Sequence, residues 1–425
     1  MKENHKISML LPVCFTLLFA LFMTRTILRA DVENYNIQVA LCTNIVIISM
    51  LIVATLLCWL KNFQIFSVLA AVFILLTIGS AYQSLFGALG YMGHAILSFC
   101  AMVLGFLLIR YHSDFTNSEY AMVTVGILVL LIMNLLFGAS TRADTDSALW
   151  VSFGGLSFQP GELIRVLLIL QASMSYRRKS RAIIYSICAI ISAGVLLILH
   201  DFGGAAVILV LFLVATYQLL DNRLLTCGLI LSGLICFLVL LLSNSYAIDR
   251  FLATGKALEG TEATQQGKMI KMVLFSGVFG TGLSDYSNAV QDIYSSESDL
   301  ALAGVQVVFG IPVLIIVMFA YCALIIQVAR NKSVYPSGHL LPMQLALMTS
   351  IQVMLNYCGS LDVLPFTGIT APFISRGGSS MVTYGLIIGM SAGGFCPAIN
   401  QRRLYFCRKS KGRGRKRRMI SNAEK

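Results

Sequence analysis

Long apolar stretches alternate with short polar connections along the chain. Twelve of these stretches approach the roughly twenty residues that an α-helix needs to cross a bilayer. They lie at residues 7–28, 38–59, 63–83, 89–110, 119–138, 160–176, 182–199, 203–220, 224–244, 303–329, 340–360 and 381–398. The stretches are unbroken, whereas the strands of a membrane β-barrel alternate in polarity over about ten residues. The pattern predicts an all-α polytopic membrane protein with a bundle of about 12 transmembrane helices.

The composition excludes an ordinary soluble protein. Of the 425 residues, 57% are hydrophobic and 12% are charged, and the mean hydropathy is +0.82. Soluble proteins carry charge on about a quarter of their residues. The first stretch follows Lys2 and Lys6, as the apolar part of a signal peptide would. It is too long for one and lacks a small-residue cleavage site, so we expect a retained membrane anchor.

The net charge of +12 is unevenly distributed, and this predicts an orientation. Eleven of the 31 basic residues lie between Arg402 and Lys425. With the amino terminus inside, 22 basic residues fall on the inner side, eight fall outside, and Arg165 lies within a span. The bias agrees with the positive-inside rule, so both termini are predicted to be cytoplasmic. No aromatic platform accompanies the basic tail, which argues against nucleic-acid binding.

One connection, residues 245–302, is much longer than the others and is predicted to be extracytoplasmic. Long loops in compact domains are usually functional or disordered. Within it, Met269–Phe279 is apolar enough to form an amphipathic or re-entrant helix against the membrane face. The glycines of Gly277–Gly282 permit a sharp turn at its end. A nucleotide-binding glycine loop is the weaker alternative, because no strand precedes these residues.

The cysteines and histidines indicate neither a disulfide framework nor a built-in zinc site. The 11 cysteines have no paired spacing, and most lie in apolar stretches, where cysteine is a small core residue. The five histidines are scattered, with no second ligand four residues away.

Three polar segments lie within or against the predicted spans, where ionisable groups are costly and are therefore candidates for function. In the first, Phe158–Arg165, a proline opens a helix that carries Glu162 and Arg165 on one face. The alternative is a structural ion pair that ties helices together. In the second, His200–Gly204, Asp201 lies in a tight outward-facing turn, and its alternative role is to cap the next helix.

The third segment runs from Leu364–Ile369 into Pro372–Ser380, with two prolines and several glycines between apolar spans. Irregular backbone at membrane depth must be shielded from lipid, so this segment is predicted to be re-entrant and to line a polar cavity. Arg376, with Ser375 before it and two glycines after it, would make an anion site suited to pyrophosphate. The alternative is a plain extracytoplasmic loop with a solvated arginine.

Together these segments resemble the SEDS family of shape, elongation, division and sporulation proteins (FtsW, RodA and SpoVE), which are integral-membrane peptidoglycan glycosyltransferases. The resemblance runs from Trp150 to about Ala398. Family members carry Phe-Gln-Pro-Ser-Glu with a lysine three residues later, where this chain has Gly161 for the serine and Arg165 for the lysine. The family's Pro-Asp-Leu-Gly-Thr matches His200–Gly204.

The longest match is to Leu-Pro-x-Thr-Gly-Ile followed by Pro-Phe-Ile-Ser-Tyr-Gly-Gly-Ser-Ser. It corresponds to Leu364–Ile369 and Pro372–Ser380, with Arg376 for the tyrosine.

The family's catalytic aspartate follows a Gly-Leu-Phe-Gly-x-Gly turn, in the pattern His-Thr-Asp. Gly277–Gly282 supplies the turn, and Glu297-Ser298-Asp299 takes the place of His-Thr-Asp, so Asp299 is the expected catalytic residue. A pair of glutamates that follows in many members falls on Val307 and Val308.

The resemblance implies polymerisation of lipid II, with Asp299 as general base and with Glu162 and Arg165 as catalytic neighbours that orient it or tune its pKa by charge. The residues expected to bind substrate are Gln159, Asp201, Thr367, Ser375, Arg376, Gly377, Gly378, Ser379 and Ser380. Glu297 and Asp299 are candidate ligands of a divalent cation, Mg²⁺ or Mn²⁺, and no organic cofactor is expected.

The implied partner is a class B penicillin-binding protein, a transpeptidase, in addition to lipid II and membrane lipids. The role in cell division, elongation or sporulation stays open. Two other functions also stay open. One is a lipid-carrier flippase or transporter, because many spans and central charges suit a transporter as well. The other is a catalytically silent scaffold for the transpeptidase, because the residues around Asp299 depart from the family pattern.

The resemblance also divides the chain. Residues 1–140 hold five predicted spans, two more than expected, since family members usually have about ten spans in all. Residues 141–400 would form the SEDS-like catalytic core, including the loop 245–302, and residues 401–425 the basic cytoplasmic tail.

Overall fold

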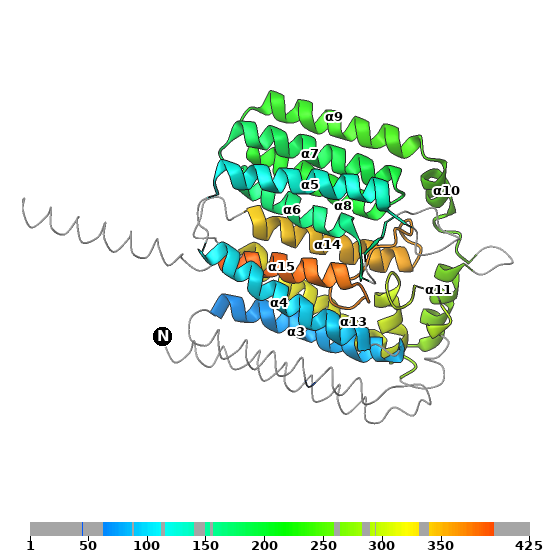
Figure 1. The fold of residues 1–425 in the computed structure, drawn as a ribbon. Helices are drawn as coiled ribbons and strands as arrows, with labels where there is room; N and C mark the ends of the chain where they lie inside the picture. Colours follow the sequence, from blue (N-terminus) through cyan, green and yellow to red (C-terminus); the bar gives the residue numbers. More distant parts are fainter. Residues whose placement is uncertain are drawn as a thin grey trace, which may run out of the picture.

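The computed structural model describes residues 45, 63–86, 89–111, 115–139, 149–153, 156–258, 264–282, 290–293, 295–330 and 340–394. In this part of the chain, long helices lie side by side in one bundle (Figure 1). They are α3 (Phe63–Gln83), α4 (Leu89–Tyr111), α5 (Asn117–Phe137), α6 (Pro160–Met174), α7 (Lys179–Ile198), α8 (Phe202–Leu219), α9 (Arg223–Leu242), α13 (Ala301–Arg330), α14 (Leu340–Ser360) and α15 (Gly378–Gly394). The shorter elements are η1 (Ser84–Phe86), β1 (Val151–Phe153), β2 (Leu156–Phe158), α10 (Ser245–Ala253) and α11 (Gln265–Ser276).

Ten of the twelve predicted spans coincide with long helices, from α3 to α9 and from α13 to α15. The spans predicted at 7–28 and 38–59 and the tail 401–425 lie outside the described residues. Seven helices in the described part are long and apolar enough to cross a membrane. The other three are α6, α14 and α15, which have 15, 21 and 17 residues. The prediction of an all-α polytopic membrane protein is confirmed.

Helices α4 and α15 approach each other closely enough for their backbones to touch. A Cβ added at Gly389 would lie 1.9 Å from the carbonyl oxygen of Met102, and one at Gly385 would lie 2.2 Å from that of Ser98. Small residues allow such contacts between membrane helices, whose association depends on packing. Because Gly385, Gly389 and Gly393 recur every four residues, they lie on one face of α15, the face that α4 approaches.

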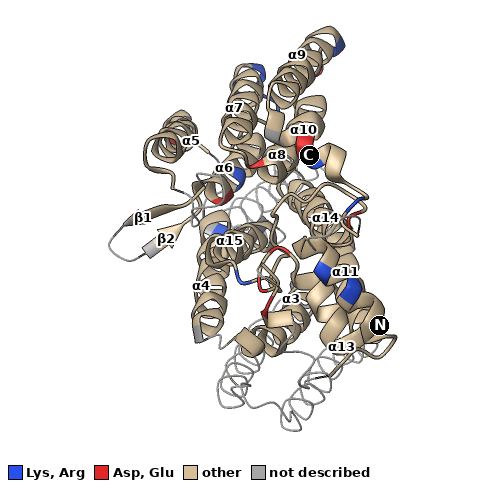
Figure 2. Cartoon of the chain, turned by 90° about the vertical axis from the view of Figure 1, so that its right-hand side faces the viewer, with Lys and Arg blue, Asp and Glu red and all other residues tan. Residues whose placement is uncertain are grey.

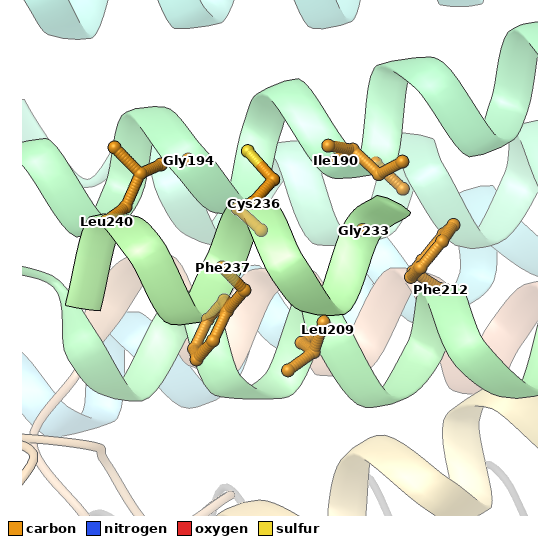
Figure 3. Close-up of a pocket in the computed structure, with 10 residues that line it drawn as sticks. Ile190, Gly194, Leu209, Phe212, Gly233, Cys236, Phe237 and Leu240 are labelled. Atoms are coloured by element: carbon orange, nitrogen blue, oxygen red, sulfur yellow. The ribbon is translucent and has the colours of Figure 1, made fainter. Parts of the chain in front are cut away.

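Burial differs across the bundle. The span of α3 is 94% buried, whereas that of α9 is only 11% buried. A small apolar gap separates part of α9 from α7 and α8, with Gly194, Phe212, Gly233 and Leu240 among its lining residues (Figure 3). Exposed leucine and isoleucine side chains cover much of α9, as expected for a helix that faces lipid.

The described part of the long connection 245–302 includes the helices α10 and α11, where one helix was predicted. Helix α11 begins four residues earlier than expected, because the hydroxyl of Thr264 caps it by accepting a hydrogen bond from the Gly267 amide at 3.0 Å. It ends before Gly277, whose φ is 65°. Helix α10 was not predicted, and the Asn244 side chain caps it by accepting from the Ala247 amide at 3.2 Å.

Helix α13 was predicted as one continuous span, but it is interrupted at Gly310, where φ is 79° and ψ is 178°. Pro312 has no amide hydrogen, so the carbonyl of Val308, four residues earlier, loses its helical partner. The break at Gly310 likewise removes the ordinary helical partner of the Val307 carbonyl.

The glycine turn that follows α11 replaces these hydrogen bonds. The amides of Thr281 and Gly282 donate to the Val307 and Val308 carbonyls at 2.8 and 2.9 Å. In return, the Ile311 amide donates to the carbonyl of residue 278 at 2.8 Å. The interruption of α13 is therefore one of the places where the long connection is fixed to the bundle.

Candidate active site

A cavity of about 620 Å³ lies at the end of the bundle where α10 and α11 are found. Its wall combines segments that are far apart in sequence: the hairpin before α6, the α7–α8 turn, α10, α11, the residues before α13, and the irregular segment between α14 and α15. Figure 2 views this end, where acidic and basic residues lie in the loops beside α15. The volume is in the range of ligand sites, about 300–1,000 Å³.

Asp299 lies in this wall, just before α13 begins. The Asn356 side-chain amide donates to the Asp299 carbonyl at 2.9 Å, and the Ser360 hydroxyl donates to it at 3.4 Å. A Cβ added at Gly368 would lie 3.7 Å from Oδ2 of Asp299, so the Thr367–Gly368 turn passes beside the carboxylate. Asp299 is thus a partly exposed carboxylate on a fixed backbone, which suits a general base.

Hydrogen bonds to backbone groups join the residues before Asp299 to the segment between α14 and α15. The side-chain amide of Gln83, at the end of α3, donates to the carbonyls of Glu297 and Ile374, at 2.8 and 2.9 Å. The Arg376 backbone amide donates to the Glu297 carbonyl at 2.8 Å. These bonds bring two motifs from different parts of the sequence into one wall of the cavity.

The side chains of Glu297 and Arg376 also form an ion pair. Nη1 of Arg376 lies 2.7 Å from Oε2 of Glu297, and the side chains are 40% and 39% exposed. Both residues of the pair line the cavity, and Glu297 lies two residues before Asp299 in the sequence. The predicted anion site at Arg376 is therefore shared with a carboxylate of the same chain.

The structure brings most of the sequence-predicted substrate-binding residues to the cavity. Those that line it are Gln159, Thr367, Arg376, Gly377, Ser379 and Ser380, together with Glu297 and Asp299. The Gln159 amide donates to the Ser379 hydroxyl at 3.1 Å, which joins the start of α6 to the start of α15.

Ser375, Gly378 and Asp201 do not line the cavity wall. Ser375 is buried, where its hydroxyl accepts from the Ala371 amide at 2.8 Å and donates to the Ser298 carbonyl. A Cβ at Gly378 would lie 2.7 Å from Nε2 of His94, so this glycine allows α4 to approach the start of α15. Their predicted contacts with substrate remain predictions.

Glu162, Arg165 and Asp201 form a buried cluster that is not part of the cavity wall. Nη1 of Arg165 lies 3.1 Å from Oε1 of Glu162, and its Nη2 lies 3.7 Å from Oδ2 of Asp201. Oδ1 of Asp201 accepts from the Gly204 amide at 2.7 Å and so caps α8. This geometry agrees with the two structural alternatives, an ion pair that ties helices together for Glu162 and Arg165 and a helix cap for Asp201. The catalytic role of Glu162 and Arg165 remains a prediction.

Sequence reasoning missed two charged residues of the cavity, Arg250 on α10 and Asp362 after α14. Nη1 of Arg250 donates to the Phe366 carbonyl at 2.7 Å, and the guanidinium lies 6.0 Å from the Phe366 ring centroid. Oδ2 of Asp362 accepts from the Ala257 amide at 2.8 Å. Both residues lie in polar connections, where a charged side chain gives no signal unless the tertiary contact is known.

The cavity offers few ligands to the predicted divalent cation. Within the described ranges, no group of three or more His, Cys, Asp or Glu side chains could hold a metal ion. Of the two proposed ligands, Glu297 already pairs with Arg376. A Mg²⁺ ion here would have to take most of its oxygens from phosphate and water. The cation remains a prediction.

Comparison with known proteins supports the resemblance. The family model for FtsW, RodA and SpoVE, described as "Cell cycle protein", matches residues 48–392. The chain is 28% identical over 279 residues to the probable peptidoglycan glycosyltransferase FtsW of Bacillus subtilis, which covers 60% of this chain and 68% of that protein. It is 24% identical over 320 residues to the peptidoglycan glycosyltransferase RodA of Mycobacterium bovis, which covers 69% of this chain and 66% of that protein.

A solved structure has the same fold. The study that reports it is titled "Structural coordination of polymerization and crosslinking by a peptidoglycan synthase complex", and the similar chain in it has a TM-score of 0.56 and 21% identity. The match covers 76% of this chain and 96% of that chain. Since the family model covers most of the sequence, including every motif that lines the cavity, the chain belongs to the FtsW/RodA/SpoVE family of cell cycle proteins, the SEDS family.

Proposed function

We propose that this protein is a peptidoglycan glycosyltransferase that polymerises lipid II into glycan strands at the outer face of the cytoplasmic membrane. The names of the curated relatives support the reaction class. The observation that carries the proposal is the cavity at the end of the bundle, where Asp299 and Arg376 lie in one wall. This arrangement offers a base and a cation to a substrate whose sugars and pyrophosphate lie at the membrane surface.

In the proposed reaction, the 4-hydroxyl of the acceptor sugar attacks the anomeric carbon of the donor. The new bond joins that oxygen to the anomeric carbon, while the bond from the carbon to the pyrophosphate oxygen breaks with inversion. Asp299 accepts the hydroxyl proton. Undecaprenyl pyrophosphate leaves with the electron pair of the broken bond, and Arg376 stabilises its developing negative charge. The amino-terminal end of α15, where Ser379 and Ser380 line the cavity, adds a favourable dipole.

The experiment that tests this proposal is polymerisation of lipid II by the purified chain in detergent or nanodiscs, with and without its co-purifying transpeptidase. Asp299→Ala is expected to abolish glycan strands without loss of folding. Asp292→Ala is the matched control, because Asp292 is an exposed carboxylate of the same connection that does not line the cavity. Equal activity of the Asp299 variant and the wild type would contradict the proposal.

The same preparation separates the other functions. Lipid II movement across vesicle membranes without polymer would favour a flippase. Transpeptidase binding without polymer by any preparation would favour a silent scaffold.

We also propose a class B penicillin-binding protein as partner, and cytoplasmic positions for both termini. The similar solved chain comes from a complex that coordinates polymerisation with crosslinking, which supports a crosslinking partner. The positive-inside bias supports the orientation. Protease accessibility of tags at each terminus in sealed vesicles tests it.

A further inference from the structure

The Glu297–Arg376 ion pair is not needed to hold the two segments together. The backbone of this region is already fixed by the bond from the Arg376 amide to the Glu297 carbonyl and by the two bonds from Gln83. The Ser375 hydroxyl adds a bond to the Ser298 carbonyl. The side-chain ion pair is therefore additional to the hydrogen bonds that join the two segments. Since it lines the cavity, we look for its role in ligand binding there.

An ion pair in this setting is easily exchanged. The side chains of Arg376 and Glu297 are 40% and 39% exposed, and exposed ion pairs hold together weakly. A diphosphate group offers a guanidinium several charged oxygens, so it can bind bidentately and more strongly than one carboxylate oxygen. Because Glu297 occupies Nη1 of Arg376, a diphosphate that reaches this guanidinium meets the Glu297 carboxylate at the same place.

We propose that Glu297 is an internal competitor for the diphosphate group at Arg376. Its carboxylate holds the guanidinium when no diphosphate is bound, gives way when a diphosphate enters, and returns as the diphosphate leaves. This inference rests on the proposed function, which places the leaving pyrophosphate at Arg376. It makes Glu297 a positioning residue that sets the affinity for substrate and product alike and so promotes product release.

The other cavity acids fit this role less well. The Asp362 carboxylate accepts a hydrogen bond from the Ala257 amide, which ties it to the connection that follows α10. Asp299 is assigned to the hydroxyl of the acceptor sugar. Among the ion pairs within the described residues, the one that Arg376 makes is with Glu297. Arg250 and His200 are further basic residues in the wall.

The test measures binding to the full chain in nanodiscs by calorimetry, with two probes. Inorganic pyrophosphate represents the free group, and farnesyl diphosphate represents the lipid-linked group. Glu297→Gln removes the competing charge but keeps the side-chain shape, so we expect about tenfold tighter binding of both probes. Combining Arg376→Met with Glu297→Gln should abolish this gain in affinity. Asp292→Asn, on an exposed carboxylate outside the cavity, is the matched control and should bind as the wild type does.

Unchanged or weaker binding by Glu297→Gln would overturn the proposal, and so would the absence of diphosphate binding by every variant. If Glu297→Gln binds only inorganic pyrophosphate more tightly, the result would support competition between Glu297 and a diphosphate. It would then assign the site to free pyrophosphate and not to the lipid-linked group. These measurements do not depend on polymerisation, so they stand even if the proposed reaction fails. If the reaction holds, Glu297→Gln should lower the KM for lipid II and, where product release limits turnover, also lower kcat.

Discussion

Arginine meets carboxylates in two places in this protein, and the surroundings differ completely. In the cluster of Arg165, Glu162 and Asp201, the side chains are 2%, 5% and 5% exposed. In the pair of Arg376 and Glu297, they are 40% and 39% exposed. Charges that have been removed from water depend on each other, whereas exposed charges retain water as a partner. The comparison indicates that the buried cluster holds the fold and the exposed pair is available for exchange.

The buried cluster also depends on close packing. Arg165 comes from α6, and Asp201 caps the start of α8, so the cluster joins two helices at their ends. Gly204 on α8 contacts both partners, since a Cβ there would lie 2.3 Å from Oδ2 of Asp201 and 2.8 Å from Nη2 of Arg165. The side chains of the cavity pair are partly exposed, and they can separate while the hydrogen bond from the Arg376 amide to the Glu297 carbonyl stays in place.

The largest effect is expected for Arg165→Met. The change leaves Glu162 and Asp201 as buried carboxylates without their cation, which should lower the free energy of unfolding by about 3–5 kcal/mol. Arg165→Lys keeps the charge but loses the fork that contacts both carboxylates, so its loss should be smaller. Unfolding in detergent measures both variants.

The control for these two variants is Arg223→Met, at the exposed start of α9. It should unfold as the wild type does. A stable Arg165→Met protein would show that the buried cluster is not structural.

A smaller loss is expected for Gly204→Ala. The added methyl group would press on the carboxylate of Asp201 and the guanidinium of Arg165, at a cost of about 1–3 kcal/mol. The matched control is Gly228→Ala on α9, where nothing lies within 4 Å of the new Cβ and helix propensity favours alanine. If the two variants melt at the same temperature, the close packing of the cluster is not important for stability.

The sequence predicted the long helices correctly because a bilayer requires about twenty apolar residues in one run. It did not predict α10, which has nine residues, or the kink in α13, which depends on the docking of the glycine turn. Such features arise from tertiary contacts and leave little trace in a hydropathy pattern. The glycines that recur every four residues on α15 are visible in the sequence. They predict close helix packing, but they do not identify the partner helix.

The candidate site was predictable to the extent that its contacts are local or that the motifs resemble a family. Glu162 and Arg165 lie three residues apart, so spacing alone placed them on one face. Glu297 and Arg376 are 79 residues apart, and no spacing rule connects them. The resemblance supplied each position separately, and only the fold shows that the two charges meet.

Arg376→Met should separate stability from activity. Since the arginine is exposed and its backbone amide bond remains, the free energy of unfolding should fall by less than about 1 kcal/mol. Loss of the cation that faces the leaving group should lower the rate of lipid II polymerisation by about 100-fold. Melting and polymerisation are measured on the same preparation, with Arg223→Met as the control for loss of an exposed arginine. An unstable Arg376→Met protein would mean that the cavity pair also holds the fold.

The smallest expected effect is the coupling between Glu297 and Arg376 in a double-mutant cycle of unfolding. An exposed pair should couple by about 0.2–1 kcal/mol at low salt. At 1 M salt the screening length falls to about 3 Å, so the coupling should become undetectable. The corresponding cycle for Glu162 and Arg165 should give a larger coupling that hardly changes with salt, because their side chains are shielded from ions. Equal salt dependence of the two cycles would contradict the difference in surroundings, and with it the assignment of one cluster to the fold and the other to exchange with a diphosphate.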